Sequence, residues 1–91
     1  MTIEYQVRSD VIESLDAYAK EGRPTGGFLR AVLANDLMEA AGHADRENSL
    51  ALTEICAYVY NELPASCHGS YDIVAAWIRR KAEEQKPKEV A

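Results

Sequence analysis

The sequence has few cysteines and no long hydrophobic run. Cys56 and Cys67 are its only cysteines, too few for a disulfide framework, so we expect two thiols in a reducing compartment. No stretch approaches the roughly 20 apolar residues that span a bilayer, and neither end shows a charged segment leading into an apolar one. We therefore expect a cytoplasmic protein that does not enter membranes.

Positive charge is also scarce. The chain has 10 lysines and arginines against 15 aspartates and glutamates, which gives a formal net charge of −5 at pH 7. This balance makes nucleic acid a less favoured partner than a basic protein surface. A modest negative charge is also a common means of staying soluble.

The composition is that of one folded domain over residues 1–91. Hydrophobic residues make up 47% of the chain and charged residues 27%, which is typical of a globular protein rather than a disordered one. A chain of this length buries only a modest core unless a partner covers part of its apolar surface. Assembly into a homo-oligomer therefore stays open.

Nothing in the sequence indicates a catalytic or metal centre. The histidines and cysteines show neither C-x-x-C nor paired-histidine spacing; they are His43, Cys56, Cys67 and His68. Cys56 lies on an apolar helical stripe, as a small core residue would, and neighbours such as Cys67 and His68 do not readily form a nucleophile and its base. We expect no enzyme, no cofactor and no metal.

What the sequence does contain is helical periodicity in four segments. Apolar residues recur three and four positions apart over 10–22, 25–42, 52–63 and from residue 70 onward. Asp10, Thr25 and Ser70 are suitable N-cap residues for three of these helices, and Gly22 is a suitable stop for the first. The sequence therefore predicts an all-α fold, a compact four-helix domain.

The apolar stripes also predict the hydrophobic core. Tyr18 and Trp77 are expected inside it, whereas the other tyrosines exceed what four short helices bury, so some of them would serve an interface. The remaining predicted core residues are Val11, Ile12, Leu15, Ala19, Phe28, Leu29, Val32, Leu33, Leu37, Met38, Leu52, Ile55, Cys56, Val59, Leu63, Ile73, Val74 and Ile78.

The two ends of the chain are expected to lie outside the helices. Residues 2–8 alternate apolar and polar side chains, with Ile3, Tyr5 and Val7 on one face, which is typical of a half-buried strand. No second strand pattern follows, so residues 1–8 form either a strand that pairs with another copy of the chain or a merely extended arm. Residues 86–91 are expected to fray.

The segment Thr25-Gly26-Gly27 at the start of the second helix has two explanations. A helix N-terminus presents free N–H groups and a partial positive charge, so the glycines would let an anion approach, with Arg23 and Arg30 nearby. Alternatively, a neighbouring helix packs closely there. Both explanations require that another group comes close to this part of the backbone.

Acidic residues line the outer faces of two predicted helices. Glu54, Tyr58 and Glu62 fall on the face of the third helix opposite its apolar stripe, and the first helix carries Asp10, Glu13 and Asp16 opposite its own. These six residues are either an ordinary solvated surface or a docking surface for an arginine- and lysine-rich partner. Tyrosine is favoured at interface centres, which supports the second interpretation.

The order of the first elements resembles the ribbon-helix-helix DNA-binding family. A strand is followed by a helix that stops at Gly22, a short turn with Thr25, and a second helix. The resemblance implies an intersubunit strand pair with Glu4, Gln6 and Arg8 reading the major groove. About half of the chain lies beyond it, and the net acidity departs from a DNA-binding surface.

A second resemblance covers roughly residues 10–80. The segments 23–37, 60–64 and 67–70, together with Trp77-Ile78, look like small phage and prophage proteins of uncharacterised activity. The resemblance implies an accessory protein or an inhibitor of host defence. We thus expect a non-enzymatic inhibitor that binds a basic host protein, such as part of a nucleic-acid-targeting (CRISPR-like) complex, in the host cytoplasm. The alternatives are a ribbon-helix-helix-like regulator and an oligomeric protein that sequesters a nucleotide at Thr25-Gly26-Gly27.

Overall fold

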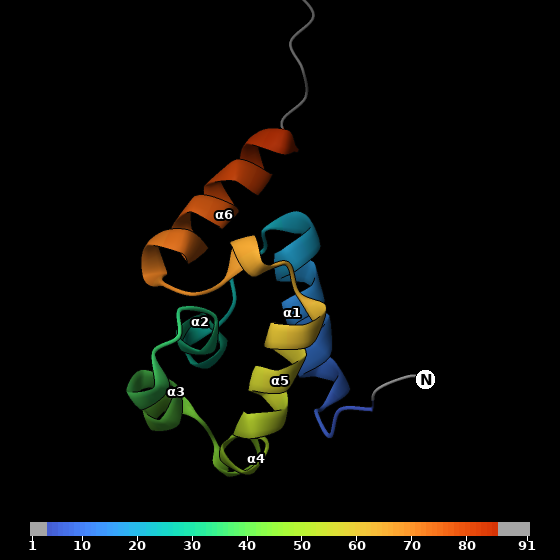
Figure 1. Cartoon of the computed structure of the whole chain (residues 1–91), viewed down its shortest axis with the longest axis vertical. Coiled ribbons are helices and arrows are strands. Elements are labelled where there is room, and N and C mark those ends of the chain that lie inside the picture. Colours follow the sequence, from blue (N-terminus) through green and yellow to red (C-terminus); the bar gives the residue numbers. More distant parts are fainter. Residues whose placement is uncertain (1–3, 86–91) are drawn as a thin grey trace, which may run out of the picture.

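The computed structural model describes residues 4–85, which are wound mainly into helices and contain no strand (Figure 1). The elements are α1 (Ser9–Glu21), α2 (Gly27–Leu33), α3 (Leu37–His43), α4 (Arg46–Leu50), α5 (Leu52–Glu62), the 3-10 turn η1 (Ala65–Cys67) and α6 (Tyr71–Glu84). The predicted all-α class is confirmed. Helices α1 and α5 lie side by side, α2 and α3 lie beyond α5, and α6 packs against α1 and α2 (Figure 1). None of the helices within 4–85 combines the length and the apolar composition needed to cross a bilayer.

The described residues form six α-helices, so the four-helix prediction was wrong in detail. The predicted second helix is interrupted at Asn35, which adopts a left-handed backbone with φ of 61°. Asparagine tolerates this conformation better than most residues. The next residue, Asp36, is the N-cap of α3, and its carboxylate accepts a hydrogen bond from the Glu39 N–H at 3.3 Å. The asparagine–aspartate pair therefore ends α2 and begins α3.

Helix α4 was also not foreseen. It begins after Asp45, whose carboxylate accepts a hydrogen bond from the Asn48 N–H at 2.7 Å. Residues 46–50, which lie between two of the predicted helical segments, are thus helical, and only Ala51 separates α4 from α5.

The core is tied together by two large aromatic side chains. Tyr18 is fully buried, and its hydroxyl donates to the carbonyl of Cys67 at 2.6 Å. The indole N–H of Trp77 donates in turn to the carbonyl of Tyr18 at 3.1 Å. These bonds join α1, η1 and α6, and they satisfy polar groups that would be costly to bury unpaired. The other buried members of this cluster are Val11, Leu15, Leu29, Leu33, Ala34, Ile55, Val59, Leu63 and Val74.

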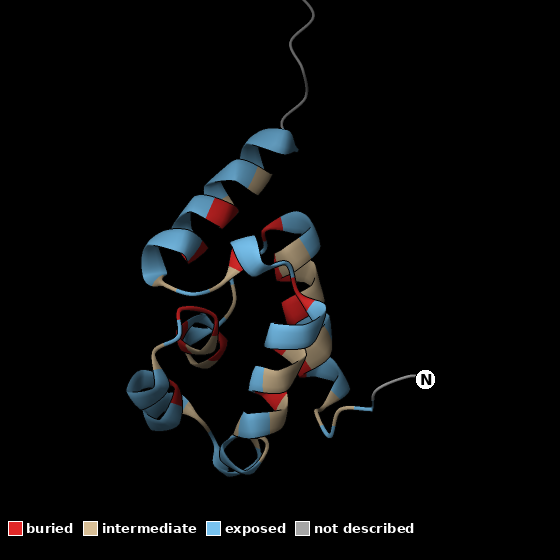
Figure 2. Cartoon of the chain, in the orientation of Figure 1, coloured by how far each residue is buried: buried red, intermediate tan, exposed pale blue. Residues whose placement is uncertain are grey.

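Several predicted core residues are exposed instead. Leu37 is 63% exposed and Met38 81%, because the break at Asn35 redirects the chain and leaves Ala40 as the buried residue of α3. Cys56 is exposed and Ile73 is 39% exposed, so their assignment to the core was wrong as well. Figure 2 shows the result, a band of buried residues between helices whose outer faces are exposed.

The N-terminal segment packs as an arm without strand structure. Over 4–8 the chain is irregular, and Val7 packs against the core. The rest of the predicted strand and the predicted tail at 86–91 lie outside the described residues. Asp10 does not cap α1, whose N-cap is Arg8 without a side-chain hydrogen bond. Ser70 caps α6 as predicted, since its hydroxyl accepts from the Ile73 N–H at 3.1 Å.

A neighbouring helix comes close to the backbone at Gly22, not at Gly26 or Gly27 as expected. Gly22 ends α1 with φ of 73°, and a Cβ there would collide with the Cβ of Lys81 on α6. No described atom lies within 4 Å of a Cβ built on Gly26, and for Gly27 the nearest is Nδ1 of His43 at 3.9 Å. No neighbouring helix therefore explains the glycine pair, and that expectation was wrong for the described residues.

We expect Gly22→Ala to destabilise the protein by about 1–2 kcal/mol or more, because alanine disfavours the left-handed conformation and its methyl group would displace α6. The matched substitution Gly27→Ala should stabilise by about 0.4–1 kcal/mol, since its backbone is helical and space is free. Urea denaturation followed by circular dichroism measures both values. Equal effects at the two positions would contradict this assignment.

Candidate functional site

The structure brings part of the predicted acidic residues together across α1 and α5. The hydroxyl of Tyr58 on α5 donates to Oδ1 of Asp16 on α1 at 2.6 Å. Glu54 and Glu62 lie one helical turn before and after Tyr58 on the same side of α5. We call Asp16, Glu54 and Glu62 the α1–α5 acidic surface.

The Tyr58 side chain lies partly beneath this surface and does not project from it. The side chain is half-buried, and the ring of Tyr5 packs edge-on against it with 5.1 Å between centroids. Burial, followed by the hydrogen bond to Asp16 and the charges of Asp16 and Glu62, raises the pKa of the Tyr58 phenol well above its usual range. The phenol therefore stays protonated and fixes the position of the Asp16 carboxylate. Its predicted role as an exposed interface ring is not supported.

Asp10 and Glu13 belong to a separate part of the surface. They line a shallow hollow of about 340 Å³ beside Arg23 and Pro24, which lie after the end of α1. Because this hollow contains charges of both signs, it is not a continuation of the α1–α5 acidic surface.

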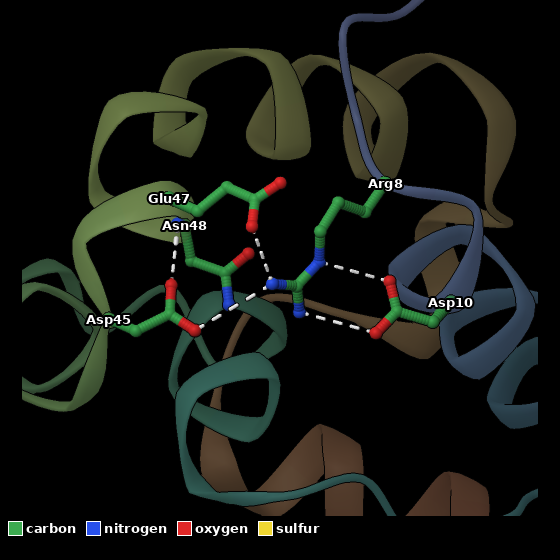
Figure 3. Close-up of polar contacts among 5 residues, drawn as sticks. All are labelled: Arg8, Asp10, Asp45, Glu47 and Asn48. Carbon is green, nitrogen blue, oxygen red and sulfur yellow. Dashed lines mark hydrogen bonds and ion pairs between the residues drawn. The ribbon is translucent and has the colours of Figure 1, made fainter.

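The negative charge of Asp10 is also offset by Arg8, in a group of ion pairs that the sequence did not predict. Arg8 contacts Asp10 through Nε at 3.0 Å, Glu47 through Nη1 at 2.9 Å and Asp45 at 3.8 Å (Figure 3). Glu47 lies 39 positions away in the sequence. Arg8 thus connects the N-terminal arm to α4.

The residues of the predicted anion site do not converge. The hydroxyl of Thr25 bonds the adjacent carbonyl of Gly26 at 3.2 Å and gives α2 no cap, contrary to the prediction. Arg23 pairs with Glu21 at 2.8 Å, and the guanidinium of Arg30 lies over the ring of Tyr71, 4.8 Å from its centroid. Both arginines therefore have other partners.

A groove between α2–α3 and α5 is a second concave feature that the sequence did not predict. Two hollows of about 340 and 50 Å³ adjoin there, and both are lined by Val32, Asn35 and Cys56. His68 closes the larger hollow; burial lowers the pKa of its imidazole, which is therefore neutral at pH 7. We call this feature the α2–α5 groove. The sequence carried no signal for it, because the break at Asn35, which opens one edge of the groove, does not interrupt the apolar spacing.

The described part of the chain contains no group of three or more histidine, cysteine, aspartate or glutamate side chains placed to hold a metal ion. Comparisons with protein-family models, with curated proteins and with solved structures find no match. The two surfaces described above are therefore interpreted from their own chemistry.

We expect Tyr58→Phe to lower the free energy of unfolding by about 1–2 kcal/mol, because it removes a hydrogen bond to a carboxylate and leaves Asp16 without that donor. Tyr60→Phe is the matched control, since Tyr60 is 80% exposed and should tolerate the same change without effect. A double-mutant cycle with Asp16→Asn measures the coupling between the two side chains. Coupling near zero would show that the bond contributes nothing.

Stability should also decline at alkaline pH. Burial above all raises the pKa of Tyr18 and of Tyr58 in the folded protein. A group with a raised folded pKa contributes stability that is complete below its unfolded pKa of about 10 and is lost as the pH rises toward the folded value. Urea denaturation between pH 8 and about 11 should show this decline, and Tyr58→Phe should reduce its slope.

Proposed function

We propose that this protein is a non-enzymatic binding protein that docks on a basic surface of a partner protein through the α1–α5 acidic surface. The observation that carries the proposal is the Tyr58–Asp16 hydrogen bond of 2.6 Å, which fixes the Asp16 carboxylate of α1 against α5, the helix that carries Glu54 and Glu62. Further support is that Asp16, Glu54 and Glu62 form no ion pair with any other residue in 4–85.

Carboxylates that form no ion pair within their own chain suit the recognition of arginine and lysine. Their charge is part of the net −5 of the chain, which speeds encounter with a positively charged partner. Arginine binds a carboxylate through two parallel hydrogen bonds, which gives directional contact. Asp16 is the best oriented of these carboxylates because Tyr58 restrains it.

The nature of the partner follows from the sequence resemblance to phage and prophage proteins. We propose a host protein whose basic surface normally holds nucleic acid, within a nucleic-acid-targeting (CRISPR-like) defence complex in the cytoplasm of the host cell. Occupation of that surface by carboxylates would exclude the nucleic acid. This identification is supported by the resemblance alone.

A pull-down from nuclease-treated host lysate tests the proposal. The wild-type protein should retain a basic protein that is released by salt, because contacts between exposed charges are screened. Glu54→Lys with Glu62→Lys should abolish this retention.

Glu83→Lys with Glu84→Lys is the matched control, because it makes the same charge change at exposed positions in the last turn of α6. It should retain the partner. A Glu54→Lys/Glu62→Lys variant that keeps every protein bound by the wild type would contradict the proposal.

A further inference from the structure

The α2–α5 groove carries an inference that goes beyond the acidic surface. Its two hollows share Val32, Asn35 and Cys56, so they form one continuous depression. The rest of the lining is largely apolar: Leu33, Val59 and Gly69 in the larger hollow, and Ala31, Ala40 and Leu52 in the smaller one. A depression of this kind suits apolar side chains of a ligand.

Large apolar side chains stand exposed on both edges of the groove. Leu37 lines the smaller hollow from α3 and is 63% exposed, and Tyr60 lines the larger one from α5 and is 80% exposed. Exposed apolar residues that flank a depression mark interaction sites more often than single exposed leucines do. An amphipathic helix that lays its apolar face into a hydrophobic groove is a recurring mode of recognition.

The charge of the groove indicates what kind of helix it takes. Neither hollow is lined by lysine or arginine, and the smaller one is lined by the carboxylate residue Asp36. The Asp36 carboxylate is held in place by the Tyr71 hydroxyl at 2.6 Å and the Glu39 N–H at 3.3 Å. A fixed carboxylate at the edge of an apolar groove complements a basic residue beside an apolar face.

We propose that the α2–α5 groove binds an amphipathic helix of the partner protein, with apolar side chains in the two hollows and lysine or arginine beside Asp36. The inference rests on the proposed function, since it places the helix on the same basic partner. The groove would then be a second contact with that partner. Burial of apolar side chains in the groove would supply affinity, and the α1–α5 acidic surface would speed the encounter by electrostatic attraction.

A second copy of this chain fits the groove poorly. The basic helix that the chain could offer is α6, which carries Arg79, Arg80 and Lys81, but Val74 and Trp77 are buried in its own core at 3% and 6% exposure. Its exposed large hydrophobic residues, Tyr71 at 37% and Ile73 at 39%, both lie in the first turn, away from the three basic residues. A symmetric contact through the groove would also bring the Asp36 carboxylates of two acidic chains toward the same interface.

The full chain contains its own reporter for the test. Cys56 is exposed and lines both hollows, whereas Cys67 is fully buried, so iodoacetamide should alkylate Cys56 first. The probe is a synthetic peptide of leucine and lysine with leucines at i, i+3, i+4 and i+7, compared with a scrambled peptide of the same composition. At a peptide concentration of about ten times Kd the alkylation rate should fall about tenfold, and the scrambled peptide should leave it unchanged.

Variants at the exposed edges test the groove without disturbing the core. Leu37→Ser with Tyr60→Ser, which removes apolar contact without adding charge, should weaken peptide binding by about tenfold or more. Leu50→Ser is the control, because Leu50 is 79% exposed and lines neither hollow. Equal protection by the scrambled peptide, or unchanged binding by the double variant, would overturn the inference.

Two further readouts separate the inference from its competitors. Protection of Cys56 that rises with protein concentration without peptide, together with a doubled solution mass, would mean that a second copy fills the groove and would overturn the inference. Glu54→Lys/Glu62→Lys should keep the peptide-dependent protection at physiological salt, where distant charges are screened. That result would support the groove even if the acidic surface proved to bind no partner.

Discussion

The hydrogen bonds around Tyr18 are the contacts on which the rest of this structure depends. They link α1 to η1 through the carbonyl of Cys67 and α1 to α6 through the indole of Trp77. The residues after η1 are held in turn against α2, because the Gly69 N–H donates to the carbonyl of Leu33 at 2.7 Å. His68 and Gly69 are therefore fixed as one wall of the α2–α5 groove, so the groove is a consequence of how the core closes.

Helical periodicity was sufficient to predict the fold class, the end of α1 at Gly22, the cap at Ser70 and the burial of Tyr18 and Trp77. It was not sufficient to predict the break at Asn35. The helical spacing of apolar residues continues across Asn35, and a single residue with a left-handed backbone does not alter that spacing. The exposure of Leu37 and Met38 follows from this one unseen turn.

The candidate surfaces were predictable to different extents. Spacing placed Glu54 and Glu62 on one face of a helix, but the bond between Tyr58 and Asp16 depends on how α1 and α5 lie relative to each other, which spacing within one helix does not define. The groove needs three helices in their final positions and could not have been foreseen. The packing explanation for the glycine pair was wrong because a glycine can also lie where no other part of the chain approaches it, as Gly26 does.

The bond between Trp77 and the carbonyl of Tyr18 also bears on how the protein is made. The two residues lie 59 positions apart, so their contact closes a loop that includes most of the helices. Contacts of such long range form late, because the chain must first lose the entropy of that loop. On the ribosome, α1 through α5 therefore emerge before α6, which supplies Trp77 to their core, and folding is completed only after Trp77 has left the exit tunnel.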